Sequence, residues 1–228
     1  MAVQTSTAPA ESGKGSGRSS GFSFGSLIRR PETGALIGTL GVFIFFAIFG
    51  APNFMSAGGA ASWLNVAAEL GIIAIPIGLL MIAGELDLSV GSVLASSSMT
   101  LAIVSGYWGQ QMIVGIAAAL GLGLLVGFVN GMLVTRTQVP SFIVTLATNF
   151  ALVGLALGFT RLITGTTSVA IAPPSWAKTL FGSLIDGKFE VAIFWWIAVM
   201  VVVGWILHIS PIGNWIFAIG GDKISARA

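Results

Sequence analysis

Long apolar runs alternate with short polar segments along most of this chain. A helix that crosses a membrane needs about 20 largely apolar residues, and six runs of roughly that length predict six spanning helices. The runs are Ala35–Met55, Trp63–Ala83, Ser92–Trp108, Met112–Thr135, Phe142–Ile163 and Val191–Ile209. We therefore predict an all-α, polytopic membrane protein.

The third run is short and polar, with Ser96, Ser97, Ser98 and Thr100 close together. Backbone or side-chain polar groups at membrane depth are tolerated only where protein or a cavity surrounds them. We expect this segment to face protein or a cavity, or to be only part of a span.

Composition supports the membrane assignment and excludes several functions. Charged residues are only 8% of the chain, against about 25% in a soluble domain, and the mean hydropathy is +0.97. Cysteine is absent and His208 is the single histidine, which excludes a thiolate site and a multi-histidine metal site. We expect no metal, no cofactor and no nucleic-acid partner.

Residues 1–34 differ in kind from the rest of the chain. They are rich in Gly, Ser and Ala, which is typical of a flexible tail. Gly15 follows Lys14 where a P-loop requires Ser or Thr, so no nucleotide site is expected there. Two domains result: a tail over 1–34 and a transmembrane domain over 35–228.

The basic residues predict the orientation, because short cytoplasmic loops carry an excess of Lys and Arg. An inside N-terminus puts seven bases in the cytoplasm and three outside. The inside bases are Lys14, Arg18, Arg29, Arg30, Arg136, Lys223 and Arg227, and the outside bases are Arg161, Lys178 and Lys188. The loop from Thr164 to Glu190 then lies outside, and the C-terminal segment inside.

The fourth run carries a stripe of small residues at every fourth position: Gly115, Ala119, Gly123, Gly127 and Gly131. Such stripes let two helix backbones approach closely in a membrane. The contact is expected either within one subunit or between two subunits.

The segment from Gly84 to Gly91, Gly-Glu-Leu-Asp-Leu-Ser-Val-Gly, places two acids between apolar runs. Asp87 and Ser89 are suited to cap the following helix. Acids at membrane depth are also candidates for a role in substrate passage or gating. Both interpretations remain open from the residues alone.

Four other polar side chains lie within the predicted spans. Glu69 lies one helical turn after Asn65, Asn130 precedes Gly131, and Asn149 lies in the fifth run. Glu69 and Asn65 are expected to hydrogen-bond each other or a neighbouring helix, or Glu69 to line a substrate path, and Asn149 is similar. Asn130 is expected to bond backbone across the Gly131 contact or to line the path.

Four segments in order resemble the permease subunits of bacterial ABC sugar importers of the ribose/xylose type. The first is Gly84–Gly91, similar to a Gly-Gly-Ile-Asp-Leu-Ser-Val-Gly signature, and the second is Asn130–Gly131. The others are Val139–Thr148, which opens the fifth run, and Pro211–Asp222, which follows the sixth. Glu85 departs from the pattern by replacing its second glycine. Such permeases usually continue with further spans, so the chain resembles a truncated permease.

The resemblance implies an inner-membrane permease that passes a monosaccharide and has no catalytic activity. It implies an ATPase subunit, a periplasmic sugar-binding protein and a second permease subunit as partners. Asp87, Ser89, Glu69, Asn130 and Asn149 are then the candidates for the path or its gate. Gly220, Gly221 and Asp222 are the candidates for coupling to the ATPase. The alternatives are an ion-coupled secondary transporter, with Glu69, Glu85 and Asp87 as coupling acids, and a non-transporting membrane scaffold.

Overall fold

The computed structural model describes residues 31–221. The chain divides into two compact units, Met1–Met55 and Ser56–Ala228. Most of the predicted tail, and Asp222 among the coupling candidates, lie outside the described residues.

The first unit contains helix α2 (Pro31–Phe49). It begins at a proline, whose fixed φ suits the first helical position. It ends at Phe49 because Gly50 and Pro52 follow, and a proline disfavours the α conformation in the residue before it. The predicted boundaries at Ala35 and Met55 are therefore wrong by several residues, and the apolar stretch Thr33–Phe49 is shorter than the other spans.

Five helical segments of the second unit are long and apolar enough to cross a membrane, judged by length and composition. They are α3 (Ala57–Ile82), α4 (Val90–Leu101) with its π-helical continuation η1 (Ala102–Tyr107), α5 (Met112–Arg136), α6 (Ser141–Thr164) and α8 (Ala192–Ile209). These match five of the six predicted runs and confirm the all-α membrane class. Helix α3 begins earlier than predicted because the Ser56 hydroxyl caps it, accepting a hydrogen bond of 3.1 Å from the Gly59 N–H.

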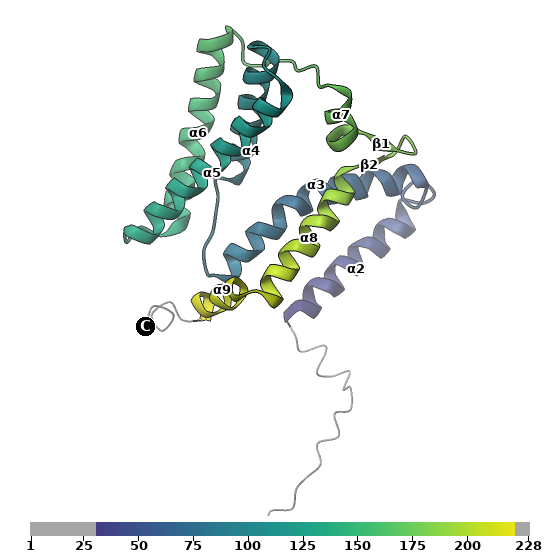
Figure 1. Ribbon diagram of the computed structural model, residues 1–228. Coiled ribbons are helices and arrows are strands. Elements are labelled where there is room, and N and C mark those ends of the chain that lie inside the picture. The colour runs from purple at the N-terminus through teal and green to yellow at the C-terminus, as the bar shows by residue number, and fades with distance from the viewer. Residues whose placement is uncertain (1–30, 222–228) are drawn as a thin grey trace, which may run out of the picture. The chain divides into compact units, whose positions relative to one another are not determined.

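The main helix contacts of this unit fall into two groups (Figure 1). In one group α4 and η1 pack against α5 and α6; in the other α3 packs against α8 and α9 (Pro211–Gly221). Small residues allow the helices of both groups to pack closely. Trp196 of α8 covers Gly71 of α3, and Ser105 of η1 covers Gly115 of α5. The extended residues that follow α3 connect the groups along the chain (Figure 1).

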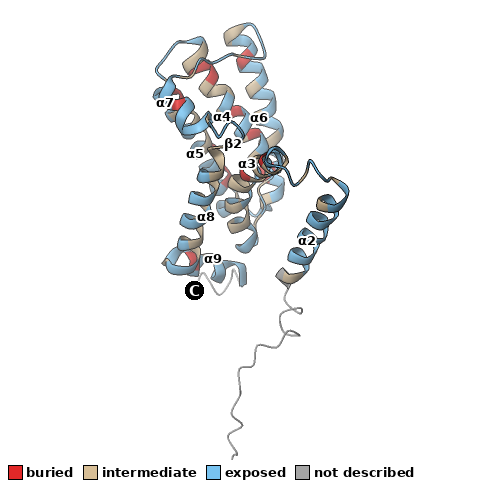
Figure 2. Ribbon diagram, turned by 90° about the vertical axis from the view of Figure 1, so that its right-hand side faces the viewer, coloured by how far each residue is buried: buried red, intermediate tan, exposed pale blue. Residues whose placement is uncertain are grey.

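Helix α4 with η1 is the most buried of the five spans, with 28% of its residues buried against at most 17% elsewhere. Ser92 and Ser96 are among its buried residues, and most other buried positions lie on the helices around it (Figure 2). The prediction that this polar run faces protein is confirmed at Ser96, whereas Ser98 is exposed. Large side chains on the other helices are widely exposed, as expected where lipid or another protein covers them.

The long connection after α6 contains short elements of regular structure. It contains α7 (Ser175–Ala177), a π-helical turn η2 (Lys178–Gly182) and an antiparallel hairpin of β1 (Leu184–Ile185) with β2 (Phe189–Glu190). The Asn65 amide of α3 holds the hairpin, donating to the Lys188 carbonyl (2.9 Å) and accepting from the Glu190 N–H (3.0 Å). The Asn65 side chain is therefore hydrogen-bonded to this connection and not to Glu69.

Helix α9 was not expected from the sequence. Ser210 takes an extended conformation and ends α8, and Pro211 then starts the new helix. A methyl group at Gly213 would overlap the Leu207 carbonyl, and one at Gly220 would overlap the Ile82 carbonyl. Glycine at these two positions allows α9 to pack against the ends of α8 and α3.

Candidate functional site

The candidate site is built around the segment between α3 and α4, residues 83–89. Helix α3 ends in a Schellman motif at Gly84, whose φ is 77°. The Glu85 N–H donates to the Leu80 carbonyl (2.9 Å) and the Gly84 N–H to the Met81 carbonyl (3.0 Å). Glycine avoids the strain of the left-handed conformation here, so the chain leaves the helix at this residue.

The following residues run in an extended conformation beside the start of α6. The Leu86 N–H donates to the Ser141 hydroxyl (3.1 Å), and the Leu88 N–H donates to the Thr145 hydroxyl (3.0 Å). These side chains supply the partners that a strand or helix would otherwise give to the two backbone donors. The segment is therefore bonded to the group of helices that contains α4.

Asp87 folds its carboxylate back onto the start of α4. Its Oδ1 accepts from both the Ser89 N–H (2.7 Å) and the Ser89 hydroxyl (2.6 Å). The first bond satisfies one of the backbone donors that a helix start leaves free. Ser89 stands at the N-cap position but makes no capping bond with its own side chain. Of the two residues proposed to cap the helix, only Asp87 therefore does so.

The Ser89 hydroxyl extends this contact into the helix group. The Asn130 amide of α5 donates to Ser89 Oγ (3.1 Å), and the Thr148 hydroxyl of α6 donates to Asn130 Oδ1 (2.6 Å). Ser89 is 0% exposed and Asn130 is 5% exposed. Every donor points the same way, from Thr148 through Asn130 and Ser89 to the Asp87 carboxylate, so each buried group has a partner. We call these four residues the polar chain.

A small hollow of about 130 Å³ opens beside the polar chain. Asp87, Ser89 and Asn130 line it together with Gly123 and Gly127 of α5. A methyl group at Gly127 or Gly131 would meet no described atom within 4 Å, and one at Gly123 would touch Val93 at an ordinary distance of 3.8 Å. Within this chain, the glycine stripe is thus tightly packed at Gly115. A subunit interface at its other end, Gly127 and Gly131, stays a prediction.

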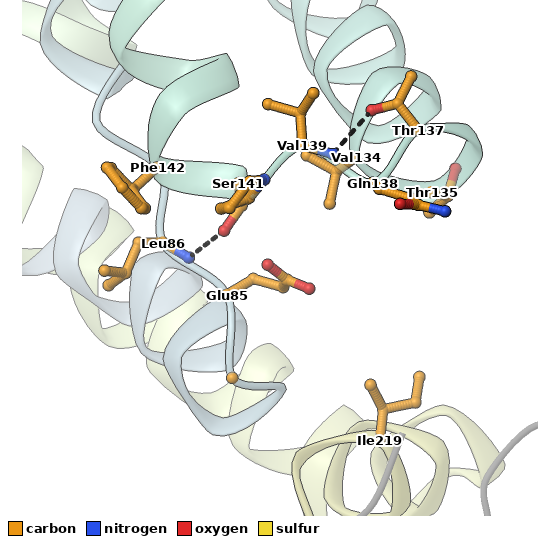
Figure 3. Close-up of a pocket in the computed structure, with 12 residues that line it drawn as sticks. Glu85, Leu86, Val134, Thr135, Thr137, Gln138, Val139, Ser141, Phe142 and Ile219 are labelled. Atoms are coloured by element: carbon orange, nitrogen blue, oxygen red, sulfur yellow. Dashed lines mark hydrogen bonds between the residues drawn. The ribbon is translucent and has the colours of Figure 1, made fainter. Parts of the chain in front are cut away.

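A larger cleft of about 640 Å³ lies beside the start of the extended segment (Figure 3). Its lining comes from Gly84, Glu85 and Leu86, from the end of α5 through the start of α6, and from Ile219 of α9. Figure 3 shows the Glu85 side chain directed into this cleft, with Thr135 and Gln138 across from it. The glutamate that departs from the family signature therefore lies where three elements meet.

The remaining candidates lie elsewhere. Glu69 is exposed on α3, and Asn149 is half-buried on α6; neither joins the polar chain. Gly220 contacts the end of α3, and Gly221 is the last residue of α9. The sequence reasoning missed Ser141, Thr145 and Thr148, although their spacing places three hydroxyls on one face at the start of α6.

The chain is similar to known membrane permeases. Residues 59–228 match the family described as "Branched-chain amino acid transport system / permease component". A probable ABC transporter permease protein, y4mJ of Sinorhizobium fredii, is 35% identical over 178 residues, which are 77% of this chain and 51% of that protein.

Two further relatives carry a sugar in their names. The xylose transport system permease protein XylH of Haemophilus influenzae is 34% identical over 75% of this chain and 44% of its own length. The ribose import permease protein RbsC of Escherichia coli is 30% identical over 77% of this chain and 54% of its own length. The chain thus spans about half the length of the curated relatives it matches. No solved structure matches the chain at a significant level.

Proposed function

Because the chain belongs to the family of branched-chain amino acid transport system permease components, we propose that it is the permease subunit of an ABC importer. Its cargo in this proposal is a monosaccharide, in keeping with the xylose and ribose permeases among its relatives. The observation that carries the proposal is the polar chain. It joins the signature segment to two spanning helices, α5 and α6, through hydrogen bonds that include the buried side chains of Ser89 and Asn130.

The proposal includes three partners and an orientation. An ATPase subunit supplies the energy, a periplasmic protein delivers the sugar, and a second permease subunit completes the path. The N-terminus lies in the cytoplasm, so α9 and the cleft beside Glu85 face the ATPase. Gly220, Gly221 and Asp222 are then part of the coupling surface.

In such a transporter, the polar chain would hold the extended segment against one group of helices. The extended segment bonds to α4, α5 and α6 through side chains, while Gly84 joins it to α3 and the other helix group. Movement of one group against the other would then bend the chain at Gly84 and leave the polar chain intact. ATP and the sugar shift such a conformational equilibrium only through different affinities for the two states.

Reconstitution tests the proposal. The permease, its ATPase and its binding protein are placed in liposomes, and uptake of labelled xylose and ribose is measured with ATP inside. We expect uptake that requires ATP and the binding protein and that stops with an inactive ATPase. Uptake driven by a proton or sodium gradient without the ATPase would contradict the proposal and support a secondary transporter.

A further inference from the structure

A groove of about 610 Å³ lies between the first half of α5 and the connection that precedes α8. Its volume is within the range of about 300–1,000 Å³ that small-molecule pockets occupy. One wall consists of Met112, Ile116 and Leu120, which recur at the helical period on one side of α5. Leu101, the last residue of α4, also lines the groove, and the opposite wall comes from Ile171 and from residues of α7 and η2. Both walls are largely apolar.

The groove begins at one edge of the membrane and extends inward. From Met112, the first residue of α5, to Leu120 the helix rises about 12 Å at about 1.5 Å per residue. This depth is within one leaflet, which contributes about 15 Å to a hydrocarbon core of about 30 Å. The opposite wall lies at the level where α8 begins, because the indole N–H of Trp195, in the first turn of α8, donates to the Leu180 carbonyl (2.8 Å). Three elements thus place the groove in the outermost part of a single leaflet.

Aromatic rings and one base stand at the edge of the groove. Phe181 of η2 stacks on Trp195 of α8, with ring centroids 5.7 Å apart, and tryptophan is enriched at the level of the lipid headgroups. Lys178 begins η2 and is exposed, and it is the single charged residue among the described residues that line the groove. Its ammonium group forms no ion pair or hydrogen bond within the part of the chain that the structure describes. A positive charge therefore lies beside an apolar surface at headgroup level.

This arrangement is complementary to the two ends of a phospholipid. The apolar walls offer an acyl chain close packing contacts, which favour association inside a bilayer. A lysine side chain extends along apolar surface and keeps its ammonium group among polar groups, where a phosphate oxygen accepts a charge-assisted hydrogen bond from it. Basic pockets beside spanning helices bind anionic headgroups in this way.

We propose that the groove binds one anionic phospholipid, with an acyl chain along α5 and the headgroup phosphate at Lys178. The competing occupant is a further protein segment, from a second subunit or from the length that the relatives have in addition, and the experiments below distinguish the two. Lipid binding at the groove does not depend on which solute the transporter carries.

Lipid titration tests the headgroup contact. The assembled transporter is depleted of lipid in detergent, and its thermal unfolding is followed as phosphatidylglycerol is added. A ligand that binds the folded state raises the unfolding temperature as its concentration increases. We expect Lys178→Gln to raise the concentration that gives half of the shift at least fivefold, because the charge that holds the phosphate is lost. Lys188→Gln, at an exposed position of the same connection, is the matched control and should leave this concentration unchanged.

Three results of the titration would overturn the proposal. An unchanged half-shift concentration in Lys178→Gln would show that this base does not hold the headgroup. An equal effect of zwitterionic phosphatidylcholine would show that the groove does not select an anionic lipid. The same shift with inorganic phosphate alone would assign the site to a free anion.

Photolabelling tests the acyl chain and the competing occupant. Phosphatidylglycerol with a diazirine in one acyl chain is photolysed with the assembled transporter, and we expect label in residues 112–120 and 178–182. Ala119→Trp fills the groove from α5 and should reduce this label at least fivefold. Ala117→Trp, at an exposed position of the same helix outside the groove lining, should not. Absence of label from both segments of the unmodified transporter would show that protein covers the groove, and the proposal would be wrong.

Discussion

Replacement of Asp87 separates the charge of this residue from its hydrogen bonds. Asn at this position keeps an acceptor oxygen for both the N–H and the hydroxyl of Ser89, which now lie 2.7 and 2.6 Å from Asp87 Oδ1. A hydrogen bond to a charged group contributes about 1.5–3 kcal/mol, and a neutral one about 0.5–1.5 kcal/mol. We therefore expect Asp87→Asn to lower the free energy of unfolding by about 2 kcal/mol over the two bonds.

Asp87→Ala removes the acceptor and leaves both Ser89 donors unpaired. Ser89 is 0% exposed in the unmodified chain, and its hydroxyl cannot turn to Asn130 Nδ2, which is itself a donor. A buried donor without a partner costs about 1–3 kcal/mol. We expect a loss of about 2–6 kcal/mol in the free energy of unfolding, which is enough to reduce the folded fraction of a marginally stable protein.

The measurements are thermal unfolding in detergent and ATP-driven uptake. We expect stability to decrease in the order unmodified chain, Asp87→Asn, Asp87→Ala, and uptake by Asp87→Asn to fall at least fivefold because the charge beside the hollow is lost. Asp186→Asn, at an exposed turn of the hairpin, is the matched control and should change neither. Equal stability of the two Asp87 variants would refute the hydrogen-bond reasoning. Normal uptake by Asp87→Asn would restrict Asp87 to a structural role.

Three other predictions concern packing and orientation. Gly115→Leu should lower the melting temperature, because a side chain there meets Ser105 and overpacking typically costs about 1–3 kcal/mol. Gly127 has open space beside it within this chain, so Gly127→Leu should lower the melting temperature only in an assembled dimer. Gly220→Val should detach α9 from α3, since it would overlap the Ile82 carbonyl, and should lower ATP-driven uptake while the permease still accumulates; normal uptake would argue against coupling through α9. A cysteine at Ser183 should react with an impermeant thiol reagent in intact cells, and one at Gln138 only after lysis, if the N-terminus is inside; the reverse pattern would invert the orientation.

The apolar runs determined most of the helical structure. Five of the six predicted spans are present because a run of about 20 apolar residues has few alternatives to a helix in lipid. Local chemistry also determined the break after α3, since Gly84 permits the left-handed turn that ends it. The boundaries of α2 were predicted less well because the hydrophobic pattern continues past Phe49, while Gly50 and Pro52 end the helix.

Only the tertiary structure decided which polar groups meet. Ser89 and Asn130 are 41 positions apart, and their contact depends on how α4 and α5 are rotated against each other. The same rotation brings Gly115 against Ser105 and leaves Gly127 open, although both belong to one stripe in the sequence. Helical periodicity places residues on a face, but the neighbour of that face is set by side-chain packing between helices distant in sequence.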